Sequence, residues 1–480
     1  MRLNDLLKNV TVLETNADLE MEISSVSSDT RKDIIDGSLF VALNGFAFDG
    51  NKYIPMAMEK GATVVVTAKK PEQQVCYVLV EDDRLALARI AANFYGHPAD
   101  SMTMIGVTGT NGKTSVTWLL KQVLEKCKGA KVGLIGTMEN RIGDRVLETD
   151  RTTPESIQLQ QLFAQMRDAG CSHVIMEVSS HAIALHRVEG IQFAVGAFTN
   201  LTEDHLDFHK TMENYGQTKA KLFDHCDKAV VNGDCPWGKR MVAGKDIPTV
   251  VTAVDGKGDL RAENVEFSGD GLDFTAVYGN ESAKIQVPIP GKFTVYNVLT
   301  VLGIATQLGV ALEDAATALK TMQGVKGRVE VVPTPGKNFT ILIDYAHTPD
   351  GLENVLHAVR GFCKGRLIAV FGCGGDRDRT KRPIMGGIGV RLADLAVITS
   401  DNPRTEAPGA IIDDILAGLG SAKNYVAIEN RIEAIHYAIN IAQKDDIIVL
   451  AGKGHETYQE VMGVKHHMDE REIVAEYLKK

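Results

Sequence analysis

The amino-acid sequence predicts an α/β protein of three domains: a small N-terminal α/β domain, a central parallel-sheet domain with a phosphate-binding loop (P-loop), and a C-terminal Rossmann-like domain. The first observation is length, because 480 residues exceed what one hydrophobic core usually organises. The second is the alternation of short apolar runs with helical patterns, which is typical of buried parallel strands in β-α-β units. The third is a pair of glycine- and proline-containing breaks near residues 96–98 and 331–336, which set the boundaries at 1–99, 100–331 and 332–480.

The first hundred residues contain two short apolar runs, at 38–43 and 62–67, separated by turns with glycine and aspartate. Such runs are typical of strands in a small α/β domain. Further on, Gly96 and Pro98 interrupt a helical pattern, because neither residue continues a helix well. We therefore expect a first domain that ends before residue 100.

Apolar runs also mark the strands of the other two domains. In the central domain they occupy residues 102–107, 174–178 and 194–199. In the C-terminal domain they occupy residues 341–343, 367–371, 395–399 and 447–451. Helical patterns separate the runs, so we expect a parallel sheet covered by helices in each domain, and a doubly wound one in the C-terminal domain.

Composition and charge exclude several classes of protein. Hydrophobic residues make up 44% of the chain and charged residues 24%, as in ordinary globular domains. The net charge of −10 disfavours nonspecific binding to nucleic acid or to an anionic membrane. Seven cysteines without a CxxC pair or zinc-ligand spacing indicate a reducing compartment. No run of 18 apolar residues and no signal-peptide pattern occurs, so we expect a cytoplasmic protein without membrane insertion.

The segment after the run at 102–107 has the features of a phosphate-binding loop. Its glycines let backbone N–H groups approach phosphate oxygens, and the helix that follows adds positive potential at its N-terminus. Lys113 can reach the terminal phosphates and Thr114 can bind Mg²⁺. Val107 stands where the usual GxxxxGK spacing has its first glycine. A turn with a surface lysine is the alternative, but strand, loop and helix follow in the expected order. We therefore predict a nucleotide-binding site for ATP at Gly109, Thr110, Asn111, Gly112, Lys113, Thr114 and Ser115.

Two further segments that follow predicted strands carry candidate metal ligands. Glu177 lies near the end of the run at 174–178, and the carboxyl ends of parallel strands are where ligands bind in open α/β sheets. We expect Glu177 to bind Mg²⁺, and the alternative is a glutamate that faces solvent. His205 lies in the segment 200–209 after the next run and could bind a second Mg²⁺. This ion prefers oxygen donors, however, and a structural histidine would be the commoner outcome.

Three other positions are weak indicators when each is taken singly. Lys219 lies in a helical pattern, where most lysines are exposed. Arg328 could balance phosphate charge, and the segment 344–349 could place a ring against a nucleotide base.

Taken together in their order along nearly the whole chain, these segments resemble the Mur ligase family. The matching positions are 109–115, 177–181, 202–207, Lys219, 296–297, Arg328 and 344–349. The resemblance implies the three-domain architecture, and the family's own loop has the same departure from the usual spacing. It also implies an ATP-dependent ligase that joins an acid to an amino acid through an acyl phosphate, in peptidoglycan precursor synthesis.

The segment Asp401-Asn402-Pro403-Arg404 resembles the members of the family that add meso-diaminopimelate to UDP-N-acetylmuramoyl-L-alanyl-D-glutamate. The far end of diaminopimelate bears a carboxylate that lysine lacks, and the fork of an arginine matches a carboxylate with two hydrogen bonds. Taken alone, the segment would be an Asn-Pro turn with an exposed arginine. The resemblance gives the amino-acid site as Arg377, Asp401, Asn402, Pro403, Arg404, Gly452 and Glu456.

The resemblance assigns the remaining roles by position. Catalytic roles fall on Lys113, Lys219, Arg328 and His205, and the ATP site gains Asn297, Arg328, Asp344 and His347. Two Mg²⁺ ions would be held by Thr114, Glu177, His205 and Lys219, the last carbamylated by CO₂ so that it offers an anionic oxygen in place of an ammonium. The UDP substrate would contact Ser28, Thr30, the loop 45–49, Thr152, Thr153, Ser179 and Arg187. The implied partners are these small-molecule substrates, and the chain is expected to be a monomer.

Three different functions also fit parts of this pattern. A lysine-adding Mur ligase would differ in the segment 401–404. A folylpolyglutamate synthase-like ligase shares the phosphate loop and the acyl-phosphate chemistry, although the first hundred residues and the segment 401–404 argue against it. A P-loop ATPase without ligase activity would turn over ATP with no need for a carboxylate substrate and an amino acid.

Overall fold

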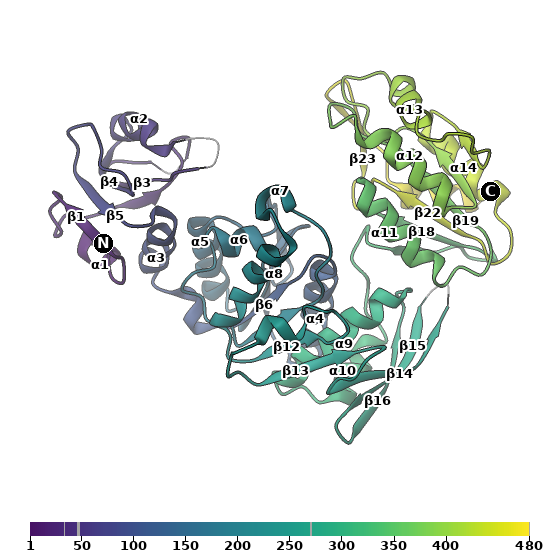
Figure 1. Ribbon diagram of the computed structural model, residues 1–480, viewed down its shortest axis with the longest axis horizontal. Coiled ribbons are helices and arrows are strands. Elements are labelled where there is room, and N and C mark those ends of the chain that lie inside the picture. Colours follow the sequence, from purple (N-terminus) through teal and green to yellow (C-terminus); the bar gives the residue numbers. More distant parts are fainter. Residues whose placement is uncertain (33, 46–48, 269–270, 480) are drawn as a thin grey trace. The chain divides into compact units, whose positions relative to one another are not determined.

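The computed structural model describes residues 1–480 except 33, 46–48, 269–270 and 480. The chain divides into two compact units. The first contains Met1–Leu260 and Thr300–Ala311, and the second contains Arg261–Leu299 and Leu312–Lys480. Each unit combines helices with sheets (Figure 1), so the predicted α/β fold class is confirmed.

The first unit begins with a five-stranded sheet. Its order is β1-β5-β4-β3-β2, and all neighbours are parallel except β1 and β5. Its strands are β1 (Val12–Thr15), β2 (Ser25–Ser27), β3 (Ser38–Ala42), β4 (Ala62–Thr67) and β5 (Tyr77–Val80), and its helices are α1 (Leu3–Leu6), α2 (Ile54–Glu59) and α3 (Asp83–Tyr95). Helix α3 ends at Gly96, whose φ of 69° lies in the left-handed region that glycine adopts readily. The predicted runs at 38–43 and 62–67 are therefore strands, and a glycine ends the helix as expected.

A larger sheet forms the rest of the first unit. Within this unit its order is β13-β12-β11-β6-β10-β7-β8-β9, and the strands from β13 to β7 are parallel. The strands are β6 (Thr103–Thr108), β7 (Val132–Ile135), β8 (Asn140–Ile142), β9 (Arg145–Leu147), β10 (His173–Glu177), β11 (Val195–Phe198), β12 (Ala229–Asn232) and β13 (Thr249–Ala253). The helices are α4 (Lys113–Lys128), α5 (Ser156–Asp168), α6 (Ser180–Ala184), α7 (Leu206–His209) and α8 (Met212–Ala220).

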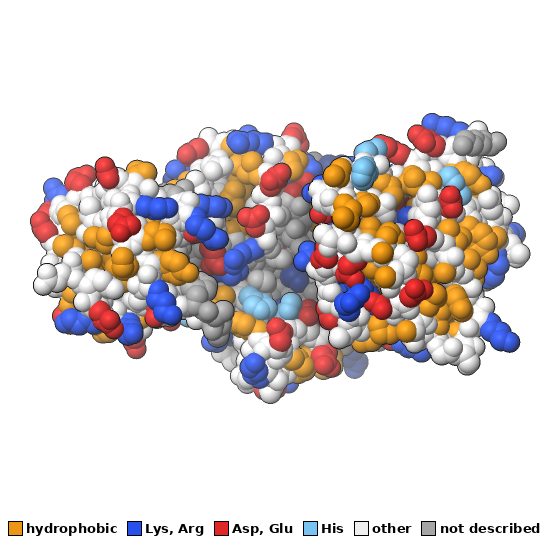
Figure 2. All heavy atoms as spheres, turned by 90° about the horizontal axis from the view of Figure 1, so that it is seen from above, with side chains coloured by type: hydrophobic (Ala, Val, Ile, Leu, Met, Phe, Trp, Pro, Cys, Tyr) orange, Lys and Arg blue, Asp and Glu red, His pale blue; other side chains and the backbone are white. Residues whose placement is uncertain are grey.

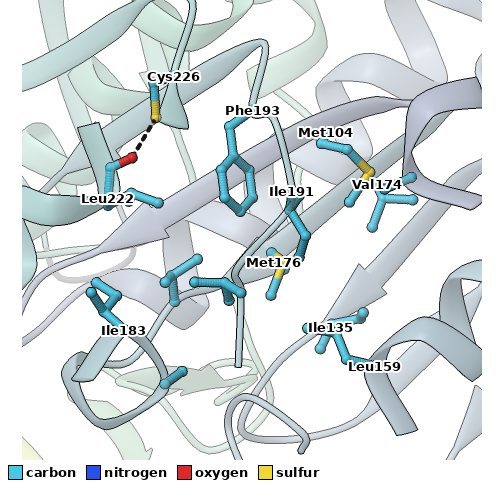
Figure 3. Packing of buried hydrophobic residues seen from close by; sticks show 14 of the residues in the cluster. Met104, Ile135, Leu159, Val174, Met176, Ile183, Ile191, Phe193, Leu222 and Cys226 are labelled. Carbon is cyan, nitrogen blue, oxygen red and sulfur yellow. Dashed lines mark hydrogen bonds between the residues drawn. The ribbon is translucent and has the colours of Figure 1, made fainter. Parts of the chain in front are cut away.

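Burial explains why the central strands read as apolar runs. Met104, Val174 and Met176 on the sheet pack with Leu159 of α5 and with Phe193, which precedes β11 (Figure 3). The apolar positions of α4 are likewise buried, namely Val116, Leu119, Leu120, Val123 and Leu124. A strand that is covered on both faces has no solvent-facing positions, so it loses the alternation of apolar and polar residues.

The register of the parallel strands brings three loops to one edge of the sheet. Strand β6 lies between β10 and β11, with Val107 opposite Glu177 and Thr108 opposite Phe198. The segments that follow these strands therefore leave the sheet side by side, at its carboxyl edge. The phosphate loop is one of them.

The second unit contains two sheet regions. The strands β14 (Leu260–Phe267), β15 (Leu272–Tyr278) and β16 (Glu281–Val287) are neighbours in that order, and β15 and β16 are antiparallel. Helix α9 (Lys292–Gln307) follows them and belongs to the first unit from Thr300 on, and helix α10 (Leu312–Leu319) comes next in the second unit.

The second sheet region has six strands in the order β17-β18-β22-β19-β20-β21, which are parallel except for β17. Its strands are β17 (Glu330–Val332), β18 (Thr340–Asp344), β19 (Leu367–Phe371), β20 (Leu395–Ile398), β21 (Tyr425–Ala427) and β22 (Ile447–Ala451). The helices are α11 (Pro349–Arg360), α12 (Lys381–Leu392), α13 (Pro408–Leu416), α14 (Arg431–Ile441) and α15 (Glu470–Leu478), and a hairpin of β23 (Tyr458–Val461) and β24 (Val464–His467) precedes α15. Separate apolar clusters cover the two faces of the sheet, so the predicted doubly wound arrangement is confirmed.

The surface mixes charges of both signs. On the face shown in Figure 2, acidic and basic side chains are interspersed among apolar and neutral ones. Among the helices that the structure describes, none has both the length and the apolar composition needed to cross a bilayer.

Candidate active site

The phosphate loop connects β6 to α4 with unusual backbone angles. Gly109 has a φ of 147° and Gly112, at the N-cap of α4, has a φ of 87°. A Cβ atom built on Gly109 would lie 1.9 Å from Oγ1 of Thr199, which follows β11. The loop is tied to the same neighbouring segment by a hydrogen bond of 2.8 Å from the backbone N–H of Thr110 to the carbonyl of Asn200. Close backbone approach therefore requires glycine at position 109.

Two lysines converge on this loop. Nζ of Lys113 donates to the carbonyls of Gly109 and Thr110, each at 2.9 Å, and Nζ of Lys219 donates to the carbonyl of Gly109 at 3.0 Å. Lys219 is 1% exposed, and its ammonium lies 4.6 Å from the ring centre of Tyr215. Burial lowers the pKa of Lys219 well below its ordinary value, and the positive charge of Lys113 lowers it further. The alternative of an exposed helical lysine is therefore excluded for this residue.

Glu177, at the end of β10, is completely buried. Its Oε1 accepts a hydrogen bond of 2.9 Å from the backbone N–H of Thr137, and its Oε2 accepts one of 3.0 Å from the hydroxyl of Thr137. That hydroxyl also lies 3.0 Å from Oγ1 of Thr152. The alternative of a solvent-facing glutamate is excluded, because the carboxylate is held inside the site.

The residues predicted to hold the UDP substrate form two groups. The hydroxyl of Thr153 donates to the carbonyl of Glu177 at 2.8 Å and lies 3.3 Å from Oγ of Ser179. Arg187 donates to the carbonyl of Thr153 at 3.1 Å and pairs with Glu155 at 2.6 Å. Thr152, Thr153, Ser179, Arg187 and Glu177 therefore share one hydrogen-bonded network.

Ser28 and Thr30 belong to the other group, in the loop that follows β2 of the five-stranded sheet. Thr30 is buried, and its carbonyl accepts a hydrogen bond of 2.6 Å from Lys60. The predicted contact loop 45–49 includes residues 46–48, which lie outside the described residues.

Imidazoles gather beside Tyr215, whose hydroxyl lies 3.2 Å from Oγ1 of Thr110 in the phosphate loop. The ring of His181 lies 4.9 Å from that of His205 and 5.6 Å from that of His209, measured between ring centres. His205 is about half exposed and lies 3.3 Å from Asp204. His209 is buried and lies 2.9 Å from Oγ of Ser180. Burial, and then the charge of His181, lowers the pKa of His209 to about 4.

The predicted metal ligands have a donor chemistry that suits Mg²⁺. Thr114 supplies a hydroxyl and Glu177 a carboxylate, and a carbamate on Lys219 would supply a further anionic oxygen, whereas His205 offers the only nitrogen of the predicted set. Mg²⁺ prefers such oxygen donors and usually keeps several waters. Among the described residues, no group of three or more histidine, cysteine, aspartate or glutamate side chains is gathered as in an all-protein metal cage.

Three residues predicted to contact ATP lie at or near the carboxyl end of β18, in the second unit. The carboxylate of Asp344 accepts hydrogen bonds of 2.9 Å from the N–H groups of Val329 and Ala346, and burial raises its pKa. The guanidinium of Arg328 lies 5.6 Å from the ring centre of Tyr345, and its buried Nε has no hydrogen-bond partner among the described residues. His347 is exposed, with Nδ1 2.7 Å from the carbonyl of Tyr345. Asn297, the fourth, is buried on α9.

The segment Asp401 to Arg404 follows β20 and joins the hairpin of β23 and β24. Backbone hydrogen bonds run from Arg404 to the carbonyl of Glu460 at 3.1 Å and from Met462 to the carbonyl of Arg404 at 2.7 Å. The side chain of Arg404 is only 23% exposed, since it lies 3.3 Å from the carboxylate of Glu460 and donates to the carbonyl of Gly375 at 2.8 Å. An exposed arginine on a turn is therefore the wrong description.

The other predicted amino-acid residues meet this segment. Oε2 of Glu456 accepts a hydrogen bond of 2.9 Å from the amide of Asn402. A Cβ atom built on Gly452 would lie 2.5 Å from the carboxylate of Asp401. Arg377 is exposed, on the loop after β19. The structure thus brings together Asp401, Asn402, Pro403, Arg404, Gly452 and Glu456 and leaves Arg377 on a neighbouring surface loop.

Two residues of these networks were missed by reasoning from the sequence. Lys453 is completely buried, and its ammonium lies 2.7 Å from Oδ1 of Asn402 and 3.1 Å from Oε2 of Glu456. Its place between Gly452 and Glu456 was the available signal. Thr137 follows the carboxyl end of β7, which lies beside β10, and this position could have indicated it.

Three family models match most of the chain. The model described as Mur ligase middle domain matches residues 107–305, that of the Mur ligase glutamate ligase domain matches 327–454, and that of the Mur ligase family catalytic domain matches 22–95.

Curated relatives match the chain over its whole length. The UDP-N-acetylmuramoyl-L-alanyl-D-glutamate--2,6-diaminopimelate ligase of Clostridium tetani is 46% identical over 485 residues, which cover 100% of this chain and 99% of the relative. The ligase of the same name from Clostridioides difficile is 45% identical over 486 residues, which cover 100% of both chains.

Solved structures show the same fold. A structure of a ligase with that name has a TM-score of 0.75 and 29% identity, and the match covers 100% of this chain and 99% of the other. The folylpolyglutamate synthase of Mycobacterium tuberculosis, complexed with ADP and AMPPCP, has a TM-score of 0.58 and 17% identity, over 77% of this chain and 92% of the other. At that identity the second likeness concerns the fold alone.

Proposed function

Because the chain belongs to the Mur ligase family, we propose that it is an ATP-dependent ligase that adds meso-2,6-diaminopimelate to UDP-N-acetylmuramoyl-L-alanyl-D-glutamate. The names of relatives that are 42–47% identical over 95–100% of the chain support this substrate pair. The structural observation that carries the proposal is the convergence of Lys113 and Lys219 on one carbonyl of the phosphate loop. The product is a precursor of peptidoglycan.

The reaction proceeds in two steps, phosphoryl transfer to the carboxylate and attack of the amine on the acyl phosphate. An oxygen of the D-glutamyl side-chain carboxylate attacks the γ-phosphorus of ATP, which forms an acyl phosphate and releases ADP. An uncharged amine of diaminopimelate then attacks the acyl carbon, and the tetrahedral intermediate expels inorganic phosphate while the nitrogen loses a proton. The result is an amide bond.

Charge balance is the main task of the protein in the first step, because donor and acceptor are both anions. Lys113 lies where an ammonium can neutralise the terminal phosphates, since its Nζ is within 2.9 Å of two loop carbonyls. Arg328 has the charge for the same role, and its Nε is a buried donor with no partner among the described residues. His205 belongs to the same group of proposed catalytic residues.

We assign Mg²⁺ binding to Thr114, Glu177, His205 and a carbamylated Lys219. When bound, Mg²⁺ screens the phosphate charge and orients the transferred group. The lowered pKa of Lys219 supports the carbamate, because only an uncharged amine adds to CO₂ with formation of a C–N bond and loss of a proton. A cationic Lys219 would repel the metal.

The choice of amino acid is assigned to the segment Asp401 to Arg404. Arg404 is held by Glu460 and by the carbonyl of Gly375, and these two contacts leave at least three of its five N–H donors for a substrate carboxylate. Glu456 has one oxygen engaged by Asn402 and Lys453 and a second that can accept from the substrate ammonium. This arrangement favours diaminopimelate over lysine as the amino acid that is added.

A folylpolyglutamate synthase-like ligase and a P-loop ATPase are less well supported. Folylpolyglutamate synthase shares only the fold with this chain, at 17% identity. In a P-loop ATPase without ligase activity, the buried network around Asn402, Lys453 and Glu456 would have no amino acid to bind.

We further propose that the domains correspond to residues 1–99, 100–331 and 332–480, and that the chain acts as a monomer. All seven cysteines are free, which supports a place in the reducing cytoplasm.

The test is the formation of ligation product and phosphate with ATP, Mg²⁺ and the UDP-linked dipeptide, in the presence of meso-diaminopimelate, L-lysine or no amino acid. We expect product and stoichiometric phosphate with diaminopimelate alone. Phosphate release that is equal in all three mixtures would indicate an ATPase without ligase activity. Ligation product formed with lysine at the same rate as with diaminopimelate would indicate a lysine-adding Mur ligase.

A further inference from the structure

One residue outside every role assigned so far donates hydrogen bonds to the buried carboxylate of Glu177. Thr137 is exposed at the carboxyl end of β7. It donates two hydrogen bonds to the Glu177 side chain, from its N–H to Oε1 at 2.9 Å and from its hydroxyl to Oε2 at 3.0 Å. Glu177 itself is 0% exposed. A surface residue therefore fixes both oxygens of a carboxylate that lies beneath it.

The close approach depends on the residue before Thr137. A Cβ atom built on Gly136 would lie 2.5 Å from Oε1 of Glu177, so glycine lets the backbone come close to the carboxylate. The N–H of Gly136 lies 3.3 Å from Oδ1 of Asn140, which ties the turn back to β8. The turn is thus built to bring the backbone and hydroxyl of Thr137 to Glu177.

The direction of the hydrogen bonds follows from counting hydrogens. A hydroxyl has one hydrogen to donate, and Thr137 donates it to Glu177. At the 3.0 Å contact between the hydroxyls of Thr137 and Thr152, Thr152 must therefore be the donor. The result is a chain from Thr152 through Thr137 to Glu177, and each bond in such a chain polarises the next.

These two hydrogen bonds join two parts of the site. Glu177 is the carboxylate that we assign to Mg²⁺, and Thr152 lies beside Thr153, whose hydroxyl donates to the carbonyl of Glu177. We propose that Thr137 is a positioning residue that orients the Glu177 carboxylate for the metal and links it to the segment that holds the peptide substrate. The proposal rests on the proposed function for the identity of the metal and of the substrate.

Binding of ADP tests the proposal without any turnover. The affinity of the full-length protein for ADP is measured by calorimetry with Mg²⁺ and with a chelator, and the ratio of the two gives the metal-dependent gain. The variants are Thr137→Val, which keeps the shape and the N–H but loses the hydroxyl, and Thr137→Ser, which keeps the hydroxyl. Thr63→Val is a matched control, because the hydroxyl of Thr63 only approaches the carbonyl of Ser38 at 3.5 Å in the five-stranded sheet.

We expect Thr137→Val to reduce the metal-dependent gain by about tenfold or more, the usual order for a lost hydrogen bond to a charged group. Affinity in the chelator should stay unchanged, Thr137→Ser should restore most of the gain, and Thr63→Val should behave as the wild type. A gain that Thr137→Val leaves intact would overturn the proposal. So would an equal loss with and without Mg²⁺, or the absence of a gain in the wild type.

A double variant tests the link to Thr152. If Thr152 acts on the carboxylate through Thr137, then Thr137→Val/Thr152→Val should show the same metal-dependent gain as Thr137→Val alone. A metal-dependent gain in the double variant that is clearly smaller than that of Thr137→Val alone would overturn the hydrogen-bond chain. Because these measurements need neither dipeptide nor diaminopimelate, their outcome is independent of whether the proposed ligation is correct.

Discussion

Nζ of Lys219 lies 3.0 Å from the carbonyl oxygen of Gly109, although 110 positions separate the two residues in the sequence. The contact places a buried ammonium directly under the phosphate loop. Since burial and Lys113 lower its pKa, an uncharged amine is far more available at neutral pH than in an ordinary lysine. This relationship underlies the proposed carbamate.

Replacement of Lys219 should remove most ligase activity. In Lys219→Ala the oxygen ligand that a carbamate would provide is lost, and we expect turnover to fall by about a hundredfold or more, as when a group that screens transition-state charge is removed. Protein freed of CO₂ should lose activity and regain it with bicarbonate. With ¹³C-bicarbonate, the wild type should give a carbamate signal in NMR spectra that Lys219→Ala lacks. Wild-type turnover by Lys219→Ala would contradict the role.

Gly109→Ala should weaken the binding of ATP because the added Cβ would meet Oγ1 of Thr199 at 1.9 Å. Displacement of the loop by this clash should reduce kcat/KM by about a hundredfold. Gly129→Ala is the matched control, because Gly129 also has a positive φ, of 59°, but a Cβ there would meet nothing within 4 Å. We expect that control to cost about 1–2 kcal/mol of stability and to keep its kcat/KM. Equal loss of activity in both variants would contradict the account.

Protonation of His209 should destabilise the first unit in acid. Its pKa falls from the ordinary value of 6.5 to about 4 in the folded chain, so the unfolded chain binds more protons between these two pH values. The free energy of unfolding therefore rises with pH across this window. At pH 4 the titration of His209 should make it about 3 kcal/mol lower than at pH 7.

Urea unfolding at pH 4.5 and 7 checks this prediction. The chain has two tryptophans, Trp118 and Trp237, and both lie in the first unit, so their fluorescence reports on the region around His209. The variant His209→Gln should lose less stability than the wild type between pH 7 and 4.5. The same pH dependence in both proteins would show that His209 is not the titrating group.

Arg404→Ala should weaken the choice of diaminopimelate. Loss of a charge-assisted fork costs about 1.5–3 kcal/mol, so kcat/KM for diaminopimelate should fall by roughly tenfold to more than a hundredfold, while KM for ATP stays unchanged. Arg391→Ala is the control, because Arg391 is exposed and pairs with Glu353 on the helices of the second unit. Undiminished preference for diaminopimelate over lysine in Arg404→Ala would contradict the assignment.

The parts of the site that depend on the succession of neighbouring strands, loops and helices could be predicted from the sequence. The phosphate loop lies between a strand and a helix, and Glu177 ends a strand that is buried on both faces, so periodicity and turn residues suffice to locate them. The strands β6, β10 and β11 were predicted to within one residue at each end, because an apolar run ends where the chain leaves the covered sheet.

The parts that depend on contacts between distant segments could not be predicted by local reasoning. Lys219 has the sequence surroundings of an exposed lysine and is buried only because α8 packs against the phosphate loop. Thr137 contacts Glu177 across 40 positions, and Lys453 contacts Asn402 across 51. A single side chain has no pattern along the sequence that reveals such a partner.

Isotope transfer tests the central claim most directly, which is that the D-glutamyl carboxylate takes the γ-phosphoryl group before the amine attacks. The UDP-linked dipeptide is prepared with ¹⁸O in that carboxylate, ligation is run with ATP and diaminopimelate, and the phosphate is examined by mass spectrometry. We expect one ¹⁸O atom in each phosphate released, because the bond between the acyl carbon and the bridging oxygen breaks. Unlabelled phosphate formed together with the ligation product would contradict it.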